Sequence, residues 1–190
     1  PHLTYAVNSV PQATRDLSVG DPRGVVVSPD GNKAWVCGMG SDNVACFATA
    51  TGQRIATGVV GEGPTGIAID ASGSRLFVLN RFEGTVSVVD ATTLAEVARA
   101  GYFDPTPTVV RNGRPFLYDT HIASGLGQAS CGSCHLDARN DQLAWDLGNP
   151  AGAVKTFDQS CNLGLPAGVG QCSNFHPMKG PMATQTLVGL

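Results

Sequence analysis

Five consecutive residues combine two thiols and an imidazole at a spacing that can hold a cofactor. Cys131-Gly132-Ser133-Cys134-His135 is a C-x-x-C-H motif, which is typical of c-type haem attachment. In that chemistry Cys131 and Cys134 add to the two vinyl groups on one edge of the macrocycle, and His135 turns beneath the iron as the proximal ligand. A zinc site would need a second ligand pair, and a thioredoxin-like motif would need a βαβ context. The sequence shows neither and therefore predicts one covalently bound haem c.

The other four cysteines form two candidate disulfides. Cys37 and Cys46 lie on consecutive expected strands joined by a short Gly-rich turn, and Cys161 and Cys172 bracket a loop rich in Gly and Pro. The pairs Cys37–Cys46 and Cys161–Cys172 would leave no thiol free. They predict an oxidising compartment, the periplasm or the cell exterior, where c-type haem is also attached. Two buried reduced thiols are the alternative for the first pair.

The sixth ligand of the iron stays open on the residues alone. Met178 and Met182 lie at about the position of a distal Met in a single-haem cytochrome, and a Met ligand raises the reduction potential relative to His. An open or water-bound position is a further alternative. His121 is interpreted as a helix or packing residue and His2 as a solvated terminal residue.

The first hundred residues contain an internal repeat. Residues 22–36, PRGVVVSPDGNKAWV, align with residues 64–78, PTGIAIDASGSRLFV, at an offset of 42. Each unit has two apolar runs around an Asp-Gly or Ser-Gly turn, followed by further strands. A period near 40 with about four strands per unit is typical of β-propeller blades. The SPDG turn, the aromatic-Val pairs and the run from Asn80 to Asp90 resemble the YVTN-type propeller repeat over about residues 1–103.

These repeats are too few to close a ring. A propeller needs about four to eight blades, and residues 1–103 contain two and part of a third. We therefore expect the chain to be part of a longer protein or of a larger complex. A small β-sandwich with a chance repeat is the alternative.

The composition changes near residue 104. Residues 104–115, DPTPTVVRNGRP, read as a Pro-rich linker, and apolar residues in 116–122 fall at near-helical spacing. A short helix is therefore expected to lead into the haem motif. The sequence predicts a mixed fold, in which all-β propeller blades over 1–103 are followed by a mainly α cytochrome c-type haem domain over 116–190.

The haem segment also resembles a known superfamily. Residues 130–152 and the later run FHPMKGPMATQTLVGL are similar to the first haem domain of the bacterial di-haem cytochrome c peroxidases, which include methylamine-utilisation-type enzymes. The resemblance implies that His135 is the proximal ligand. It implies that His176, which precedes Lys179-Gly180-Pro181, is the distal ligand that leaves the iron on activation. The family's second C-x-x-C-H is absent from this chain, so a second haem is expected outside it.

Composition excludes some classes of function. The net charge is −3, so no basic field suits nucleic acid, and no run approaches the roughly 18 apolar residues of a spanning helix. The C-x-x-C-H motif predicts a c-type haem redox protein active in electron transfer. The resemblance implies a relation to the di-haem peroxidases, with peroxide reduction as a further activity, and the choice between enzyme and carrier stays open. The alternative is a non-enzymatic electron-transfer cytochrome or a propeller-based subunit of a redox assembly. The expected partner is a redox protein or a further haem domain.

Overall fold

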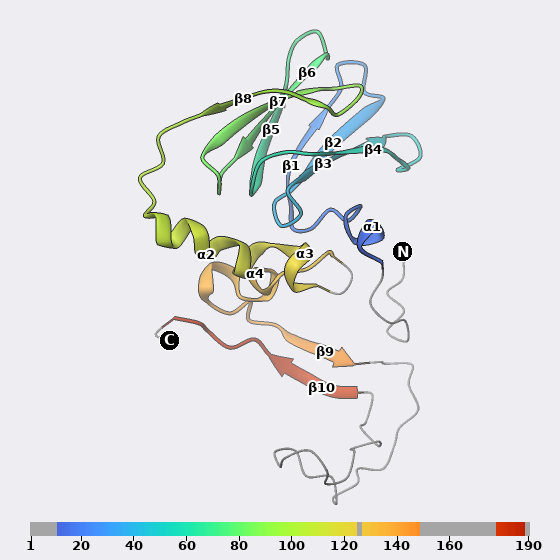
Figure 1. The fold of residues 1–190 in the computed structure, drawn as a ribbon. Helices are drawn as coiled ribbons and strands as arrows, with labels where there is room; N and C mark the ends of the chain where they lie inside the picture. Colours follow the sequence, from blue (N-terminus) through green and yellow to red (C-terminus); the bar gives the residue numbers. More distant parts are fainter. Residues whose placement is uncertain (1–10, 125–126, 149–177, 189–190) are drawn as a thin grey trace, which may run out of the picture. The chain divides into compact units, whose positions relative to one another are not determined.

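The computed structural model describes residues 11–124, 127–148 and 178–188. The chain forms two compact units: one runs from Ser9 to Cys134, and the other combines the first eight residues with His135–Leu190. The Ser9–Cys134 unit contains two four-stranded antiparallel sheets, each with its strands in chain order (Figure 1). The first sheet has strands β1 (Pro22–Val27), β2 (Lys33–Gly38), β3 (Asn43–Ala48) and β4 (Arg54–Val59). The second has β5 (Pro64–Ile69), β6 (Arg75–Asn80), β7 (Thr85–Asp90) and β8 (Glu96–Gly101).

The two sheets confirm the repeat predicted from the sequence. Each strand of the second sheet begins 42 residues after its counterpart, at 64 for 22, 75 for 33, 85 for 43 and 96 for 54. The register shifts recur at equivalent places, between Pro22 and Gly24 in one sheet and between Pro64 and Gly66 in the other. A mostly β unit with two such sheets is consistent with two blades of a partial propeller. The partial third blade falls on residues 1–10, outside the described residues.

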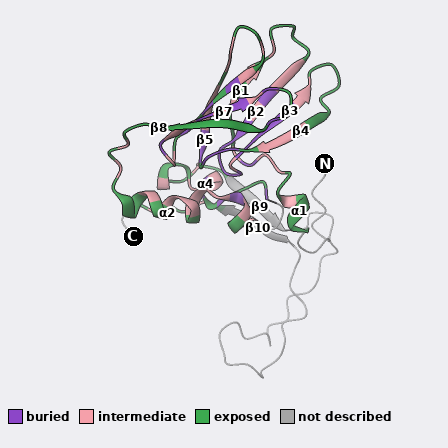
Figure 2. Cartoon of the chain, turned by 45° about the horizontal axis from the view of Figure 1, so that its top comes forward, coloured by how far each residue is buried: buried purple, intermediate pink, exposed green. Residues whose placement is uncertain are grey.

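The hydrophobic core lies between the two sheets. Alternate residues of each strand point to one face, and the inner faces meet where β1 lies beside β5. The cluster of buried residues comprises Trp35, Cys37, Val44, Cys46, Val60, Leu76, Val78, Val89, Ala91 and Leu94. Figure 2 shows this burial on the inner strands, whereas β8 is exposed along its whole length. Each fully buried Val or Leu stabilises the fold by about 1.5–3 kcal/mol.

A pair of glycines lets the sheets approach. Gly24 of β1 and Gly66 of β5 occupy equivalent positions, and a Cβ on Gly24 would lie 3.2 Å from the Cα of Gly66 and 2.8 Å from the Sγ of Cys37. A larger residue at this position would push the blades apart.

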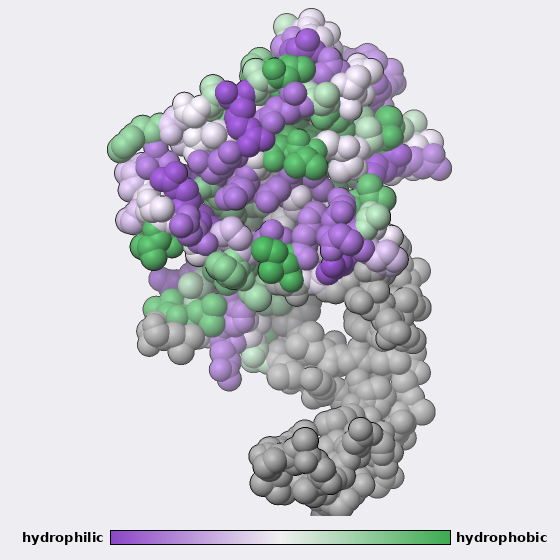
Figure 3. Space-filling model, viewed as in Figure 1, coloured by the Kyte–Doolittle hydropathy of each residue, from purple (hydrophilic) through white to green (hydrophobic). Residues whose placement is uncertain are grey.

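On the face shown in Figure 3, hydrophobic residues are scattered among hydrophilic ones over both sheets.

The predicted Cys37–Cys46 disulfide is not formed. Both cysteines are free and buried, and the register explains why. Cys37 of β2 lies opposite Val44, and Cys46 of β3 lies opposite Trp35. The two residues are therefore diagonal neighbours, whose Cα atoms lie about 7–8 Å apart in an antiparallel pair, whereas a disulfide requires Cα atoms roughly 4.4–6.8 Å apart. Burial raises the pKa of both thiols. The second predicted pair, Cys161–Cys172, lies outside the described residues.

Free thiols at these positions give a direct chemical prediction. When the chain is unfolded in denaturant with iodoacetamide and without reductant, we expect full alkylation of Cys37 and Cys46 in the peptide mass map. A parallel sample reduced before alkylation is the control and should give the same labelling. Protection of both residues until reductant is added would show a disulfide and contradict this register.

Short helices follow the sheets. They are α2 (Thr108–Tyr118), α3 (Thr120–Ala123) and α4 (Cys131–Cys134), while α1 (Gln12–Arg15) precedes β1. The segment 104–115, expected to be a linker, is therefore helical from Thr108 onward. Pro107 starts α2 as its N-cap residue, and Pro115 lies inside it. The unit boundary after Cys134 also places these helices with the sheets, not with residues 135–190.

The second unit differs from the expected helical domain. Its described part has a 3-10 turn, η1 (Leu136–Ala138), and an antiparallel pair, β9 (Ala144–Gly148) with β10 (Met178–Ala183). Gly180 and Pro181 within β10 are poor helix formers, which is a physical reason for the extended conformation. A mainly α haem domain over 116–190 is thus not seen in the described residues. No helix among the described residues is long and apolar enough to cross a membrane.

Candidate functional site

The C-x-x-C segment forms a single helical turn. Helix α4 runs from Cys131 to Cys134, and residues three apart on a helix share one face. Cys131 is exposed, Cys134 is half-buried, and neither is in a disulfide. The preceding pair with the same spacing, Ser130 and Ser133, lies on a neighbouring face of the turn. The turn thus separates a face of thiols from a face of hydroxyls.

The hydroxyl face is held by the carboxylate of Asp21, the residue that precedes β1. Ser130 Oγ donates to Asp21 Oδ2 at 2.9 Å, and Ser133 Oγ donates to Asp21 Oδ1 at 2.7 Å. The backbone N–H of Ser130 also donates to Ser133 Oγ at 2.9 Å. Ser130 is only 7% exposed. Both oxygens of one carboxylate therefore orient the turn, and we call this arrangement the Asp21 clamp.

Asp21 has a backbone conformation that favours glycine. Its φ is 46°, and the equivalent residue of the second blade is Gly63, with a φ of 63°. Left-handed backbone costs a non-glycine residue free energy, although Asp tolerates it better than most. In the first blade the glycine is replaced by a residue whose carboxylate binds α4. The clamp compensates for this strain.

The first x residue of the motif, Gly132, is packed against an aromatic side chain. Gly132 is buried, and a Cβ there would lie 2.6 Å from Cδ1 of Tyr118 in α2. The Tyr118 ring packs on Phe82, with centroids 4.9 Å apart and planes tilted by 40°. Arg114 donates from Nη1 to the Phe82 carbonyl at 3.1 Å. These contacts connect α4 through α2 to the loop between β6 and β7.

The junction of α2 and α3 is anchored to the loop between β2 and β3. The fully buried Thr120 donates twice to the Gly40 carbonyl, from Oγ1 at 2.9 Å and from its backbone N–H at 2.7 Å. Asp119 caps α3 by accepting from the N–H groups of His121 and Ile122 at 2.7 and 3.0 Å. An N-cap carboxylate satisfies donors that the helix leaves unpaired. Asp21, Thr120 and Tyr118 thus hold the C-x-x-C turn against the blades.

A second acidic residue of the first blade lies near this junction. Asp42 has a φ of 50°, where the second blade has Gly84, and its Oδ1 accepts from the Gly63 N–H at 2.8 Å. Burial raises the pKa of Asp42 to about 6, and the negative charges of Asp119, Glu62 and Glu83 add to the effect, while the Gly63 bond opposes it.

His135 is the first residue of the second unit. Its Nδ1 atom is buried and has no hydrogen-bond partner. The residues that follow have left-handed backbone, with φ values of 51° at Asp137 and 59° at Ala138. Among the described residues, no three His, Cys, Asp or Glu side chains gather into a metal site.

The donors present fit a c-type haem. Two cysteines share one face of a helical turn, the imidazole follows in the chain, and its Nδ1 is an unpaired buried atom. In haem and metal sites the imidazole nitrogen that does not bind the metal usually hydrogen-bonds a carboxylate, a backbone carbonyl or a water. The Nδ1 of His135 lacks such a partner among the described residues. Cys131 and Cys134 would form the thioethers and His135 would be the axial ligand.

The remaining predicted ligands are placed only in part. Met178 and Met182 lie in β10, where Met182 pairs with Trp145 of β9. His176, Cys161, Cys172 and His2 lie outside the described residues. His121 contacts Ser18, with Nε2 3.2 Å from Oγ, in agreement with the packing role expected for it.

Comparison with known proteins gives partial similarities. No family model matches the chain, and no curated protein matches it. Hydrazine synthase of Kuenenia stuttgartiensis is similar over 45% of this chain, with 24% identity and a TM-score of 0.44. A periplasmic gluconolactonase of Pseudomonas aeruginosa matches 45%, with 26% identity and a TM-score of 0.40. A putative 6-phosphogluconolactonase of Bacteroides fragilis matches 44%, with 26% identity and a TM-score of 0.39.

This chain spans only 24%, 28% and 27% of those three proteins. The two four-stranded sheets and their 42-residue repeat, rather than these partial matches, carry the assignment of a propeller-like fold.

Proposed function

We propose that this chain is a c-type haem redox protein of the periplasm or cell exterior. The observation that carries the proposal is the placement of two cysteines three residues apart on one face of α4, while the Asp21 clamp holds the other face. Cys131 and Cys134 would bind the macrocycle and His135 would bind the iron. When bound, haem supplies an iron that takes up and releases one electron.

The protein residues have separate tasks in this proposal. The Asp21 clamp sets the direction of the two thiols, and Gly132 lets Tyr118 lie directly against the turn. A turn fixed in this way loses little conformational freedom when the thioethers form. The residues of the blades therefore act as positioning residues, and the chemistry belongs to the motif itself.

Haem attachment tests the proposal. We expect the chain, exported to the periplasm of a host that matures c-type cytochromes, to gain the mass of one haem and to keep its haem stain on a denaturing gel. Replacing both Cys131 and Cys134 with Ala should abolish the stain, because no thioether can form. Cys37→Ala is the matched control and should keep it. Haem that remains bound to the double variant after denaturation would refute the assignment.

The relation to di-haem peroxidases, with a displaceable ligand and reactivity toward peroxide, is tested by a separate measurement. Visible and EPR spectra of the oxidised, partly reduced and peroxide-treated protein separate the two functions. A low-spin bis-His signal that becomes high-spin on partial reduction and reacts with peroxide supports a peroxidase with His176 as a displaceable ligand. A His/Met signal unchanged by peroxide supports an electron carrier with Met178 or Met182 as ligand.

A further inference from the structure

A pocket lies between the two blades, at the end where their hairpin turns meet. Its walls come from the β1–β2 turn, the β5–β6 turn around Ser72 and Gly73, and the segment after β7 at Ala91 and Thr92. Its volume is about 250 Å³. Sites for drug-sized ligands measure roughly 300–1,000 Å³, so this pocket suits a smaller molecule. Both blades belong to one compact unit.

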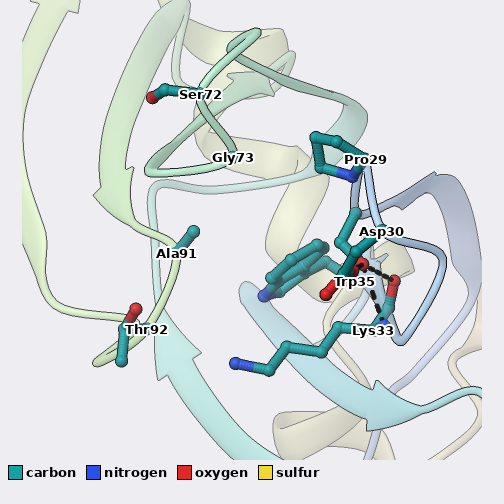
Figure 4. Close-up of a pocket in the computed structure, with 9 residues that line it drawn as sticks. Pro29, Asp30, Lys33, Trp35, Ser72, Gly73, Ala91 and Thr92 are labelled. Atoms are coloured by element: carbon teal, nitrogen blue, oxygen red, sulfur yellow. Dashed lines mark hydrogen bonds between the residues drawn. The ribbon is translucent and has the colours of Figure 1, made fainter.

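Trp35 brings an unpaired donor to this pocket. The residue is 2% exposed, and its indole Nε1 is buried without a hydrogen-bond partner. Buried indole N–H groups normally have a partner. Figure 4 shows the indole nitrogen directed toward the side of the pocket that carries Ala91 and Thr92. The Trp35 indole N–H is therefore a buried donor at this pocket that has no acceptor among the described residues.

Lys33 adds a positive charge on the same side. In Figure 4 its ammonium group points in the same direction as the indole nitrogen. The backbone of Lys33 is fixed, because its N–H donates to Ser28 Oγ at 2.9 Å and its carbonyl accepts from the Ser28 N–H at 2.9 Å. Its ammonium makes no hydrogen bond or ion pair with the residues described here.

The acidic residue of the pocket is already bonded within its own turn. Asp30 accepts from Ser28 Oγ at 2.5 Å, from the Asn32 N–H at 3.1 Å and from Asn32 Nδ2 at 2.9 Å. These hydrogen bonds, with that from Ser28 first, lower the pKa of Asp30 to about 2. The Trp35 indole N–H and the Lys33 ammonium, which make no hydrogen bond with the described residues, are both donors.

We propose that this inter-blade pocket binds a small carboxylate, with the Trp35 N–H and the Lys33 ammonium as its donors. A carboxylate has two oxygens that accept hydrogen bonds, and hydrogen bonds between charged groups are stronger than neutral ones. The inference does not depend on haem binding, because none of these residues belongs to the C-x-x-C-H motif.

Titration of the indole N–H resonance tests this site. The full chain, labelled with ¹⁵N-Trp, contains two tryptophans, Trp35 and Trp145, and Trp35→Phe assigns their signals. Acetate and succinate are the probes, and acetamide and succinamide are the neutral controls at equal ionic strength. We expect a saturable downfield shift of the Trp35 indole proton with at least one carboxylate, and a much smaller shift with its amide.

Charge variants complete the test. Lys33→Gln should weaken carboxylate binding about tenfold, the effect of losing one charge-assisted bond worth roughly 1.4 kcal/mol. Arg23→Gln is the matched control, because Arg23 is an exposed cation of β1 that does not line the pocket, and it should bind as the unaltered chain does. No saturable shift with either acid, equal shifts with the amides, or equal weakening in both variants would overturn the proposal.

Discussion

Replacement of Asp21 by Gly should destabilise the Ser9–Cys134 unit by about 1–3 kcal/mol and lower the yield of covalent haem. The substitution removes both acceptors of the Asp21 clamp and leaves the buried hydroxyl of Ser130 with only the longer contact to Ser133 Oγ, at 3.3 Å. Glycine avoids backbone strain at this left-handed position, as Gly63 does in the second blade. The loss therefore reports the clamp and not a change of backbone conformation.

Two measurements separate these effects. Urea unfolding of the haem-free chain gives the change in stability, and the fraction of chains that carry haem after export gives the effect on attachment. Asp21→Asn is the conservative control. Asn tolerates the same backbone and keeps one acceptor oxygen, so this variant should recover about half of the stability and haem yield that Asp21→Gly loses. A double-mutant cycle with Ser133→Ala should show a coupling of about 0.5–3 kcal/mol. Additive effects of Asp21 and Ser133 would rule out the clamp.

Replacement of Asp42 by Asn should stabilise the same unit at pH 7 and above. The folded-state pKa of Asp42, about 6, is above the unfolded value of about 3.9. The folded state therefore holds this proton more tightly, and stability falls as the pH rises from about 4 to about 6, after which the loss is complete. The pKa difference sets an upper limit of about 3 kcal/mol, and partial contact with solvent reduces it to about 1–2 kcal/mol.

The test is the free energy of unfolding in urea between pH 4.5 and pH 7.5. Asn keeps an oxygen that can accept from the Gly63 N–H and tolerates the φ of 50° at this position. The variant should lose the part of the pH dependence that comes from Asp42. Glu62→Gln is the control, because Glu62 is exposed and acts on Asp42 only through its charge. An unchanged slope in Asp42→Asn would show that Asp42 titrates normally.

Local features were predictable because their causes are local. The alternation of apolar residues and the Gly-containing turns specify hairpins, so residues 22–36 and 64–78 sufficed to predict the two repeated sheets. The C-x-x-C-H spacing likewise identifies a candidate haem site without reference to the fold. Pro105, Pro107 and Pro115 predict a linker where the structure has the helix 108–118, because Pro107 stands just before the helix, where a missing N–H costs little.

The tertiary structure decided what depends on register and on contacts distant in sequence. The sequence predicts that the cysteines at 37 and 46 face each other across a hairpin, but the pairing of β2 with β3 sets them two positions apart. Asp21 contacts Ser130 across 109 residues, and no sequence period connects them. The one available signal was Asp at position 21 where the repeat has Gly63. By itself the sequence determined the repeats and the haem motif, because turn chemistry and side-chain alternation act within a few residues. Only packing decided which side chains hold the motif, because such contacts form when elements far apart in the chain are brought together.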